Sequence, residues 1–431
     1  MAPASIPTVQ YEELIQADRV HGRLYYDPAI FHEELEKIWH RQWVYIGHES
    51  EVPQPGDYVT RLLGLHPVII VRDKDRAVQL LLNRCMHRGN LVCESGRGNA
   101  QEFRCIYHGW TYSTSGALLG APYSTAYGAS FRKEEYGLSK VPRVGSYRGF
   151  IFASLSPTGI SLDEHLGYAK GLIDQFVELS PAGEVELCAG TQKQRYRGNW
   201  KMQVENAVDN YHTTFVHQTA NDIMRTRSGI DLSQTTSEQS PALSRYLGGG
   251  HALFDFRPLQ RQMGKTLNLN NQAKGDGVTG ARKAYVEAME QRYGRERAQE
   301  ILQDGPPHGY IFPNLIFIQL QVRRIQPVSP GESYVYYQPS FLKGVPAEVN
   351  TARLREHEWF FGPAGFGSPD DVDIFERQQL ALQARASEWL ILRRGLHRER
   401  VEEGGIRTSH IADEGHVRGI WQHYRQLMLQ P

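Results

Sequence analysis

The chain has 431 residues, 40% of them hydrophobic, and its 48 lysines and arginines balance 48 aspartates and glutamates. This length corresponds to two or three ordinary domains, with a core large enough to fold without disulfides. A net charge of zero offers no excess of positive charge to attract a polyanion. Neither nucleic acid nor an anionic membrane surface is therefore expected as a partner. Four cysteines are too few for a secreted disulfide framework and are expected as metal ligands or inert thiols.

The N-terminal ten residues lack the basic start, long apolar stretch and small-residue cleavage site of an export signal. The longest apolar runs, 68–71 and 315–318, are far shorter than the roughly 20 residues of a membrane helix. The sequence therefore predicts a soluble protein of the cytoplasm.

Apolar residues between Tyr25 and Trp43 recur at the spacing of an amphipathic helix. Residues 44–160 then form short β-rich segments separated by glycine, aspartate and proline, which is typical of a small all-β domain. After this part, residues 161–180 favour a helix, and residues 189–204 favour a strand that leads into a helix. The strands expected in the β-rich part are 67–72, 78–83, 102–106 and 148–155.

The rest of the chain predicts two alternating strands, 310–322 and 334–341, and two long helices, 281–302 and 372–396. The polar, glycine-rich stretch 248–280 has no periodicity and is expected to be a mobile lid or a disordered loop. Together these elements predict an α+β fold, with the β-rich part inserted in a larger domain.

Two cysteine–histidine pairs stand out in the β-rich part. Cys85-x-His87 is followed, after seventeen intervening residues, by Cys105-x-x-His108, and each pair follows a strand-like segment that would hold it on a loop. Two thiolates and two imidazoles can bind one tetrahedral zinc, or they can divide over the two irons of a [2Fe–2S] cluster. Alternatively, the cysteines are buried thiols and the histidines are incidental. The two other cysteines have no partner at ligand spacing and are expected to be inert: Cys93 and Cys188.

A second group of possible ligands comprises Asp209, His212 and His217. Asp209 and His212 are three residues apart, so on a helix they share a face. His212 and His217 are five apart, about 140° around an ideal helix. Both can reach one ion only if the helix distorts or ends between them. The alternative is that both histidines are ordinary residues of an amphipathic helix.

A mononuclear iron held by two histidines needs a carboxylate and keeps open positions for dioxygen. The candidate is Asp371, in the segment Gly362-Pro-Ala-Gly-Phe-Gly-Ser-Pro-Asp-Asp371. Ser368 at the N-cap and Pro369 at the first helical position also describe a helix start, with acids at the positive end of its dipole. Because that setting keeps a carboxylate ionised, the two interpretations are compatible.

The cysteine–histidine pairs, flanked by Arg88-Gly89 and Gly109-Trp110, resemble the Rieske iron–sulfur motif. From about Trp43 to Trp421 the chain resembles the large (α) subunit of the Rieske non-haem iron ring-hydroxylating oxygenases. The resemblance implies a Rieske domain over 44–160 and a catalytic domain with a mononuclear iron over 1–43 and 161–431, with an antiparallel sheet flanked by helices. The ligands that it implies are Cys85, His87, Cys105 and His108 for the cluster, and His212, His217 and Asp371 for the iron.

The resemblance also implies roles for neighbouring residues. Asp209 matches the bridging acid that links His212 to a Rieske histidine of a neighbouring subunit. Asn206 matches an active-site asparagine, although it precedes Asp209 by three residues where hydrocarbon dioxygenases have four. Further residues that we expect in the substrate pocket, from their places next to the ligands or on the strand 310–322, are Val208, Phe215, Phe312, Asn314 and Phe366.

By resemblance, the protein is the terminal oxygenase of a multicomponent dioxygenase of aromatic catabolism, which activates O2 at Fe(II) and cis-dihydroxylates a small aromatic substrate. No GxGxxG follows a strand, so electrons from NAD(P)H would arrive through a separate ferredoxin and/or reductase, which would dock near His87 and His108. The family implies a homotrimer, or an α3β3 assembly with a small β subunit. The segment Gly365–Asp371 is more similar to benzoate-type than to naphthalene-type relatives, which favours a carboxylated aromatic substrate.

Three alternatives remain. A Rieske monooxygenase or an O- or N-demethylase has the same two centres. A zinc-stapled binding module explains the cysteine–histidine pairs but gives the second group of ligands no purpose, and it predicts a colourless protein. A simple electron carrier leaves residues 161–431 without a role.

Overall fold

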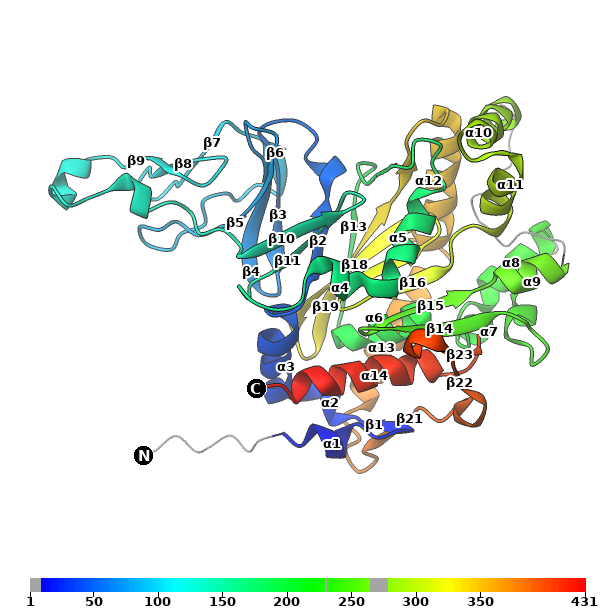
Figure 1. Ribbon diagram of the computed structural model, residues 1–431. Helices are drawn as coiled ribbons and strands as arrows, with labels where there is room; N and C mark the ends of the chain where they lie inside the picture. The colour runs from blue at the N-terminus through cyan, green and yellow to red at the C-terminus, as the bar shows by residue number, and fades with distance from the viewer. Residues whose placement is uncertain (1–8, 229–230, 264–277) are drawn as a thin grey trace.

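The computed structural model describes residues 9–228, 231–263 and 278–431. A β-rich part, drawn from blue to teal in Figure 1, projects from a larger part in which helices surround a long sheet. The predicted α+β fold with an inserted β-rich part is confirmed. Within the described ranges, no helix is long and apolar enough to cross a membrane.

Three small antiparallel sheets build the β-rich part, in the orders β5-β4-β3-β6, β7-β8-β9 and β10-β11-β2. The predicted strands are present, with shifted ends. The last begins at Phe150 because Arg148 and Gly149, both with positive φ, form the preceding hairpin turn. The bounds are β2 Val44–His48, β3 Asp57–Leu63, β4 His66–Arg72, β5 Val78–Leu82, β6 Arg97–Asn99, β7 Glu102–Arg104, β8 Thr111–Ser113, β9 Leu118–Gly120, β10 Arg143–Tyr147 and β11 Phe150–Ser154.

The larger part is organised around a nine-stranded antiparallel sheet, in the order β13-β19-β18-β17-β16-β15-β14-β23-β22. Helices α6 (Trp200–Val208) and α14 (Gly415–Met428) pack on one face. Helix α5 (Lys170–Val177) and the strands β2 and β11 share a hydrophobic cluster with the other face. The strands are β13 Gln192–Tyr196, β14 Leu243–Gly248, β15 His251–Asp255, β16 His308–Ile311, β17 Leu315–Ile318, β18 Gln321–Ser329, β19 Glu332–Pro339, β22 Arg400–Val401 and β23 Arg407–His410.

The residues before the β-rich part belong to the larger part. Helix α3 (Pro28–Glu34) begins at Asp27, whose side chain accepts from the Ala29 amide, and it continues as one π-helical turn that ends at Trp39. The predicted helix 25–43 is therefore shorter at both ends. Fully buried Glu34 accepts hydrogen bonds from α6 and α14, through Trp200 Nε1, Lys201 Nζ and Tyr424 Oη.

The predicted single strand 310–322 is wrong. It is a hairpin of β16 and β17, with its turn at Phe312–Asn314, followed by the start of β18. Pro313 has no amide hydrogen for a sheet ladder, which explains why a central strand does not continue through it. The second predicted strand, 334–341, is confirmed as β19 followed by β20 (Phe341–Leu342).

Two other predicted elements differ in extent. The helix 281–302 is two helices, α10 (Val278–Tyr293) and α11 (Arg295–Asp304), because Gly294 between them takes a φ of 79°. The helix 372–396 is α13 (Ser368–Ala381), and the chain then turns into the short strand β21 (Trp389–Ile391).

The stretch 248–280 is not one loop. Gly248, Gly249 and Gly250 all have positive φ and form the turn between β14 and β15. Beyond β15, helix α9 (Arg257–Met263) follows. The rest of the predicted lid, 264–277, lies outside the described residues. The predicted helix 161–180 is α4 (Leu162–Leu166) and α5, separated at Gly167, and 189–204 is β13 followed by α6 as predicted.

Candidate metal centres and active-site cavity

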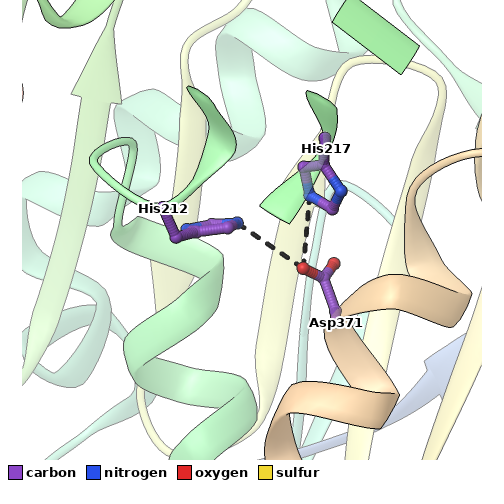
Figure 2. Close-up of side chains that lie close together, drawn as sticks. All are labelled: His212, His217 and Asp371. Carbon is purple, nitrogen blue, oxygen red and sulfur yellow. Dashed lines mark ion pairs between the residues drawn. The ribbon is translucent and has the colours of Figure 1, made fainter. Parts of the chain in front are cut away.

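His212, His217 and Asp371 converge beside the large sheet (Figure 2). His212 Nε2 lies 3.5 Å and His217 Nε2 lies 3.2 Å from the same oxygen, Asp371 Oδ1. One ligand atom from each residue lies within 4.8 Å of the others, and no other three histidine, cysteine or acidic side chains in the described ranges converge in this way. Two imidazoles and one carboxylate around one point are the donor set of a mononuclear non-haem iron site.

The two histidines meet because the chain leaves helix α6 before His212 and leaves helical geometry again at His217. Helix α6 stops at Val208, and Asp209 is extended. His212 and His217 then flank the single turn α7 (Thr213–Val216), and His217 has left helical geometry, with φ −98° and ψ 37°. The predicted break in the helix is confirmed. The predicted shared helix face of Asp209 and His212 is wrong, because a turn connects these residues.

Asp371 comes from the first turn of α13, where the helix dipole favours a negative charge. The N-cap is Gly367 and not the predicted Ser368, whose buried hydroxyl makes no hydrogen bond. The neighbouring carboxylates differ in direction: the Asp371 side chain is 7% exposed, whereas that of Asp370 is 45% exposed. The helix therefore presents one carboxylate of the pair to the two imidazoles.

The electric field of this group favours a cation. Burial alone would raise the pKa of Asp371, but hydrogen bonds to His212 and His217 hold the pKa well below its ordinary value. Burial would likewise lower the pKa of His212, yet the carboxylates of Asp209 and Asp371 raise this pKa to about 10. Because metal binding displaces such a proton, the residues present fit a divalent iron.

Asp209 and Asn206 complete the surroundings of His212. Asp209 Oδ2 lies 3.2 Å from His212 Nδ1, on the side of the ring away from Asp371, and Asp209 Oδ1 accepts a hydrogen bond from the Tyr211 amide. The Asp209 side chain is still 36% exposed. Asn206 Nδ2 lies 3.2 Å from His212 Nε2 and donates to Asp371 Oδ1 at 3.0 Å. The structure thus brings both predicted neighbours into contact with the histidine.

A cavity of about 140 Å³ opens beside the triad. Asn206, Asp209 and the three converging residues form part of its lining. The rest is mainly aromatic and apolar and contains one cationic side chain. The lining residues that matter below are Phe254, Phe256, His308, Ile318, Arg323 and Phe360.

Three predicted pocket residues are buried elsewhere and do not line this cavity, so their prediction is wrong. Val208 is fully buried in the core under α6. Phe312 packs edge-on against His423 in the same core. Asn314 joins the two parts of the chain, because it accepts from the Tyr45 amide and donates to the Tyr45 carbonyl.

Two further predicted pocket residues also lie outside the cavity: Phe215 is 68% exposed on α7, and Phe366 is 37% exposed before α13. The prediction missed the residues that β15, β16 and β18 supply to the lining. Phe254 and Phe256 lie in the stretch that was expected to be a loop, although the short apolar run Ala252-Leu253-Phe254 after three glycines is typical of a buried strand.

The four cysteine and histidine residues of the β-rich part lie on two loops with the same hydrogen bonds. In one loop the Cys85 amide donates to the Asn90 carbonyl and the Gly89 amide donates to the Cys85 carbonyl. In the other, the Cys105 amide donates to the Trp110 carbonyl and the Gly109 amide to the Cys105 carbonyl. Both glycines have φ near the left-handed region, at 75° and 72°.

The cysteines of these loops are buried, whereas the histidines lie closer to the surface, with His87 half-buried. Cys85 and Cys105 are 2% and 1% exposed, His108 is exposed, and the rings of His87 and His108 lie 4.5 Å apart. No three of these ligand atoms come within 4.8 Å of one another, as a single tetrahedral zinc requires. The separation fits a [2Fe–2S] cluster, in which the two cysteines and the two histidines bind different irons.

Tyr112 supplies a contact to this site that the sequence did not reveal. Its hydroxyl accepts a hydrogen bond from the Met86 amide at 3.1 Å, which leaves its proton free for Cys85 Sγ at 3.2 Å. We expect Tyr112→Phe to keep the cluster but to lower its reduction potential, because hydrogen bonds to sulfur stabilise the reduced state. The loss of about 1 kcal/mol corresponds to roughly 40 mV for one electron, measurable by a redox titration followed by EPR.

Tyr58→Phe is the control for this variant, because the Tyr58 hydroxyl faces Cys93, which is not among the predicted ligands. Its potential should equal that of the unmodified protein. Equal potentials for Tyr112→Phe and the unmodified protein would show that Tyr112 does not tune the cluster.

Comparisons with known proteins match both parts of the chain. The Rieske [2Fe-2S] domain matches residues 42–142, and the catalytic domain of the ring hydroxylating alpha subunit matches residues 184–430. The large subunit of 2-halobenzoate 1,2-dioxygenase from Burkholderia cepacia is 32% identical over 399 residues, which cover 88% of this chain and 82% of that protein. The α subunit of a Sphingobium N,N-dimethyl phenylurea N-demethylase is 32% identical over 381 residues, which cover 82% and 78%.

Among solved structures, naphthalene 1,2-dioxygenase with indole bound in its active site superposes with a TM-score of 0.83 at 25% identity, covering 97% of this chain and 95% of that one. The chain belongs to the Rieske ring-hydroxylating oxygenases, as an α subunit. Its cofactors are a Rieske [2Fe–2S] cluster and a mononuclear non-haem iron, and it is an oxidoreductase.

Proposed function

We propose that this protein is the terminal oxygenase of a multicomponent dioxygenase that cis-dihydroxylates a carboxylated aromatic substrate. The observation that carries the proposal is the convergence of His212, His217 and Asp371 in the wall of an aromatic-lined cavity. The same chain carries a Rieske domain, whose cluster can store one electron and pass it to a mononuclear iron. The similarity to a 2-halobenzoate dioxygenase supports the carboxylated class.

In this proposal residues 44–160 form the Rieske domain, and residues 1–43 and 161–431 form the catalytic domain. Cys85, His87, Cys105 and His108 would hold the cluster, and the converging triad would hold the iron. The bound iron supplies the open positions at which dioxygen is activated. Asn206, with its amide at the ligand atoms, orients Asp371, while the aromatic walls hold the substrate ring and exclude water.

Asp209 would connect the two centres across a subunit boundary. Its carboxylate holds the Nδ1 proton of His212 and keeps enough exposure to accept a second hydrogen bond from outside the chain. Beside Asp209, Tyr211 and Phe215 are exposed aromatic residues. Around the Rieske histidines the chain exposes a different apolar patch, which includes Ile106, at 77%, and Tyr107, at 53%.

Two different apolar patches that cover each other form a head-to-tail interface, and such an interface gives a ring when the rotation between subunits closes. We therefore propose a homotrimer, or an α3β3 assembly with a small β subunit. Electrons would come from NAD(P)H through a ferredoxin and/or a reductase that docks near His87 and His108. A cytoplasmic location would give access to these donors.

A second candidate function, N-demethylation, is favoured by the similarity to the phenylurea N-demethylase. The test is product analysis with surrogate ferredoxin and reductase on a panel of benzoates, biphenyls, fused arenes and N-methylated arenes. We expect cis-dihydrodiols from the benzoates. Formaldehyde release from N-methyl substrates, without any dihydrodiol, would overturn the proposal in favour of the demethylase.

A further inference from the structure

The cavity wall opposite α6 is one face of the large sheet. Register places Ile316 opposite both Tyr310 on β16 and Arg323 on β18, so these side chains share a face. His308, two residues before Tyr310, lies on the same face and pairs with Phe254 on β15. This alternation sends the side chains of Arg323 and His308 into the cavity, and both line it.

Arg323 is a buried cation without an anion. The residue is 2% exposed, forms no ion pair with any acid in the described ranges, and leaves its Nε without a hydrogen-bond partner. Its guanidinium lies over the rings of Tyr337 and Phe361, at 4.8 and 5.2 Å from their centres. Because a buried charge is costly unless it is paired, a guanidinium in this position favours an anionic ligand.

His308 adds a second unpartnered polar atom to the same cavity. Its Nε2 is buried and has no hydrogen-bond partner. Burial, together with the charge of Arg323, lowers the pKa of His308 to about 3, so the ring is neutral at physiological pH. A neutral imidazole still carries one N–H and can therefore donate to a ligand oxygen beside the guanidinium.

The remaining walls select a flat apolar body. Phe254, Phe256, Ile318 and Phe360 line the same cavity as Arg323 and the triad. Aromatic side chains in such positions pack against a ring by stacking or edge-on contact. A ligand that satisfies both the guanidinium and the apolar walls is an aromatic ring with one carboxylate, which the guanidinium can bind through two parallel hydrogen bonds.

We propose that Arg323, assisted by His308, binds the carboxylate of the aromatic substrate and thereby turns the opposite side of the ring toward the triad. This inference rests on the proposed function only in taking this cavity as the substrate site. It makes Arg323 the residue that separates aromatic acids from neutral arenes.

Arg324 provides a matched control. It is the next residue on β18, so its side chain leaves the opposite face of the sheet. Arg324 is also buried, with 3% of the residue exposed, and its guanidinium lies over the ring of Tyr336 at 4.1 Å. It lines a separate cavity between the Rieske part and the sheet, together with Arg61 and Lys193. A general effect of removing a buried arginine from this strand would therefore appear in both variants.

The experiment is calorimetric titration of the iron-loaded protein, without electron donors, with two pairs of probes: benzoate and benzamide, and 2-naphthoate and 2-naphthamide. In the unmodified protein, the dissociation constant of at least one acid should be lower than that of its amide by about tenfold or more. Arg323→Gln should weaken binding of that acid by about 10- to 100-fold and leave the amide within about threefold. Arg323→Lys should bind the acid with intermediate affinity, because it keeps the positive charge but loses the paired donors of the guanidinium.

Arg324→Gln should bind each probe as the unmodified protein does. Iron content and the visible spectrum of the cluster check that each variant is folded and loaded. Equal affinities for every acid and its amide, or an Arg323→Gln variant that keeps the preference for the acid, would overturn the inference. Because binding is measured without turnover, the failure of catalysis in the panel experiment would leave this result unchanged.

Discussion

Asp371→Ala is expected to abolish product formation and to lower the iron content from about three to about two atoms per chain. The reason is that Asp371 Oδ1 is the single carboxylate oxygen that faces both His212 Nε2 and His217 Nε2. Without it, two imidazoles remain, and they hold a divalent iron poorly. The measurements are metal analysis and EPR of the reduced protein, in which the Rieske signal should persist because the cluster loops do not contact α13.

The neighbouring Asp370→Ala variant is the control, since that side chain is 45% exposed and its carboxylate lies 3.6 Å from His217 Nδ1 without a hydrogen bond. It should retain nearly all of the iron. Loss of iron in Asp370→Ala with retention in Asp371→Ala would reverse the assignment of the ligand within the pair.

Asp209→Asn is expected to leave both metals bound and to slow single-turnover oxidation of the reduced cluster by about a hundredfold. The amide oxygen can keep the hydrogen bond from Tyr211, so the turn should survive. The amide nitrogen, however, would face the Nδ1 proton of His212, where the carboxylate now accepts. Two donors repel, so the hydrogen bond that would connect His212 to a neighbouring cluster is lost.

Stopped-flow absorbance of the pre-reduced variant, mixed with dioxygen and substrate, measures this rate. Asp373→Asn is the control, because that carboxylate is 58% exposed on α13 and pairs only with Arg377. Unchanged cluster oxidation in Asp209→Asn, with the metals present, would contradict a bridging role for Asp209.

The candidate ligands could be found from the sequence because short spacing constrains them. The two ligands of Cys85-x-His87 lie on one short loop, and so do those of Cys105-x-x-His108. Their spacing in the sequence therefore fixes most of their spacing in the fold. The spacing of His212 and His217 also predicted that a helix must end near them, and α7 is a single turn. Which member of Asp370 and Asp371 turns inward depended on the resemblance, and their exposures agree with it.

The cavity could not be predicted in the same way, because its walls come from strands far apart in the chain. Neighbourhood to a ligand suggested Phe215, yet the turn that places His212 and His217 inward turns Phe215 toward solvent. Arg323 is one of many arginines, and only the register of β16, β17 and β18 shows that it faces the cavity. The run 310–322 was predicted as one strand, so the hairpin at Pro313 that sets this register was missed.

The central claim is that an electron from the Rieske cluster is used at the triad to oxygenate an aromatic acid. The most direct measurement is one turnover of chemically reduced protein with ¹⁸O₂ and a benzoate, without donor proteins, followed by EPR and mass spectrometry. We predict that the Rieske signal is lost rapidly only with substrate present, and that the dihydrodiol carries two labelled oxygen atoms. A reduced protein without a Rieske signal, or cluster oxidation that yields no labelled product, would contradict the claim.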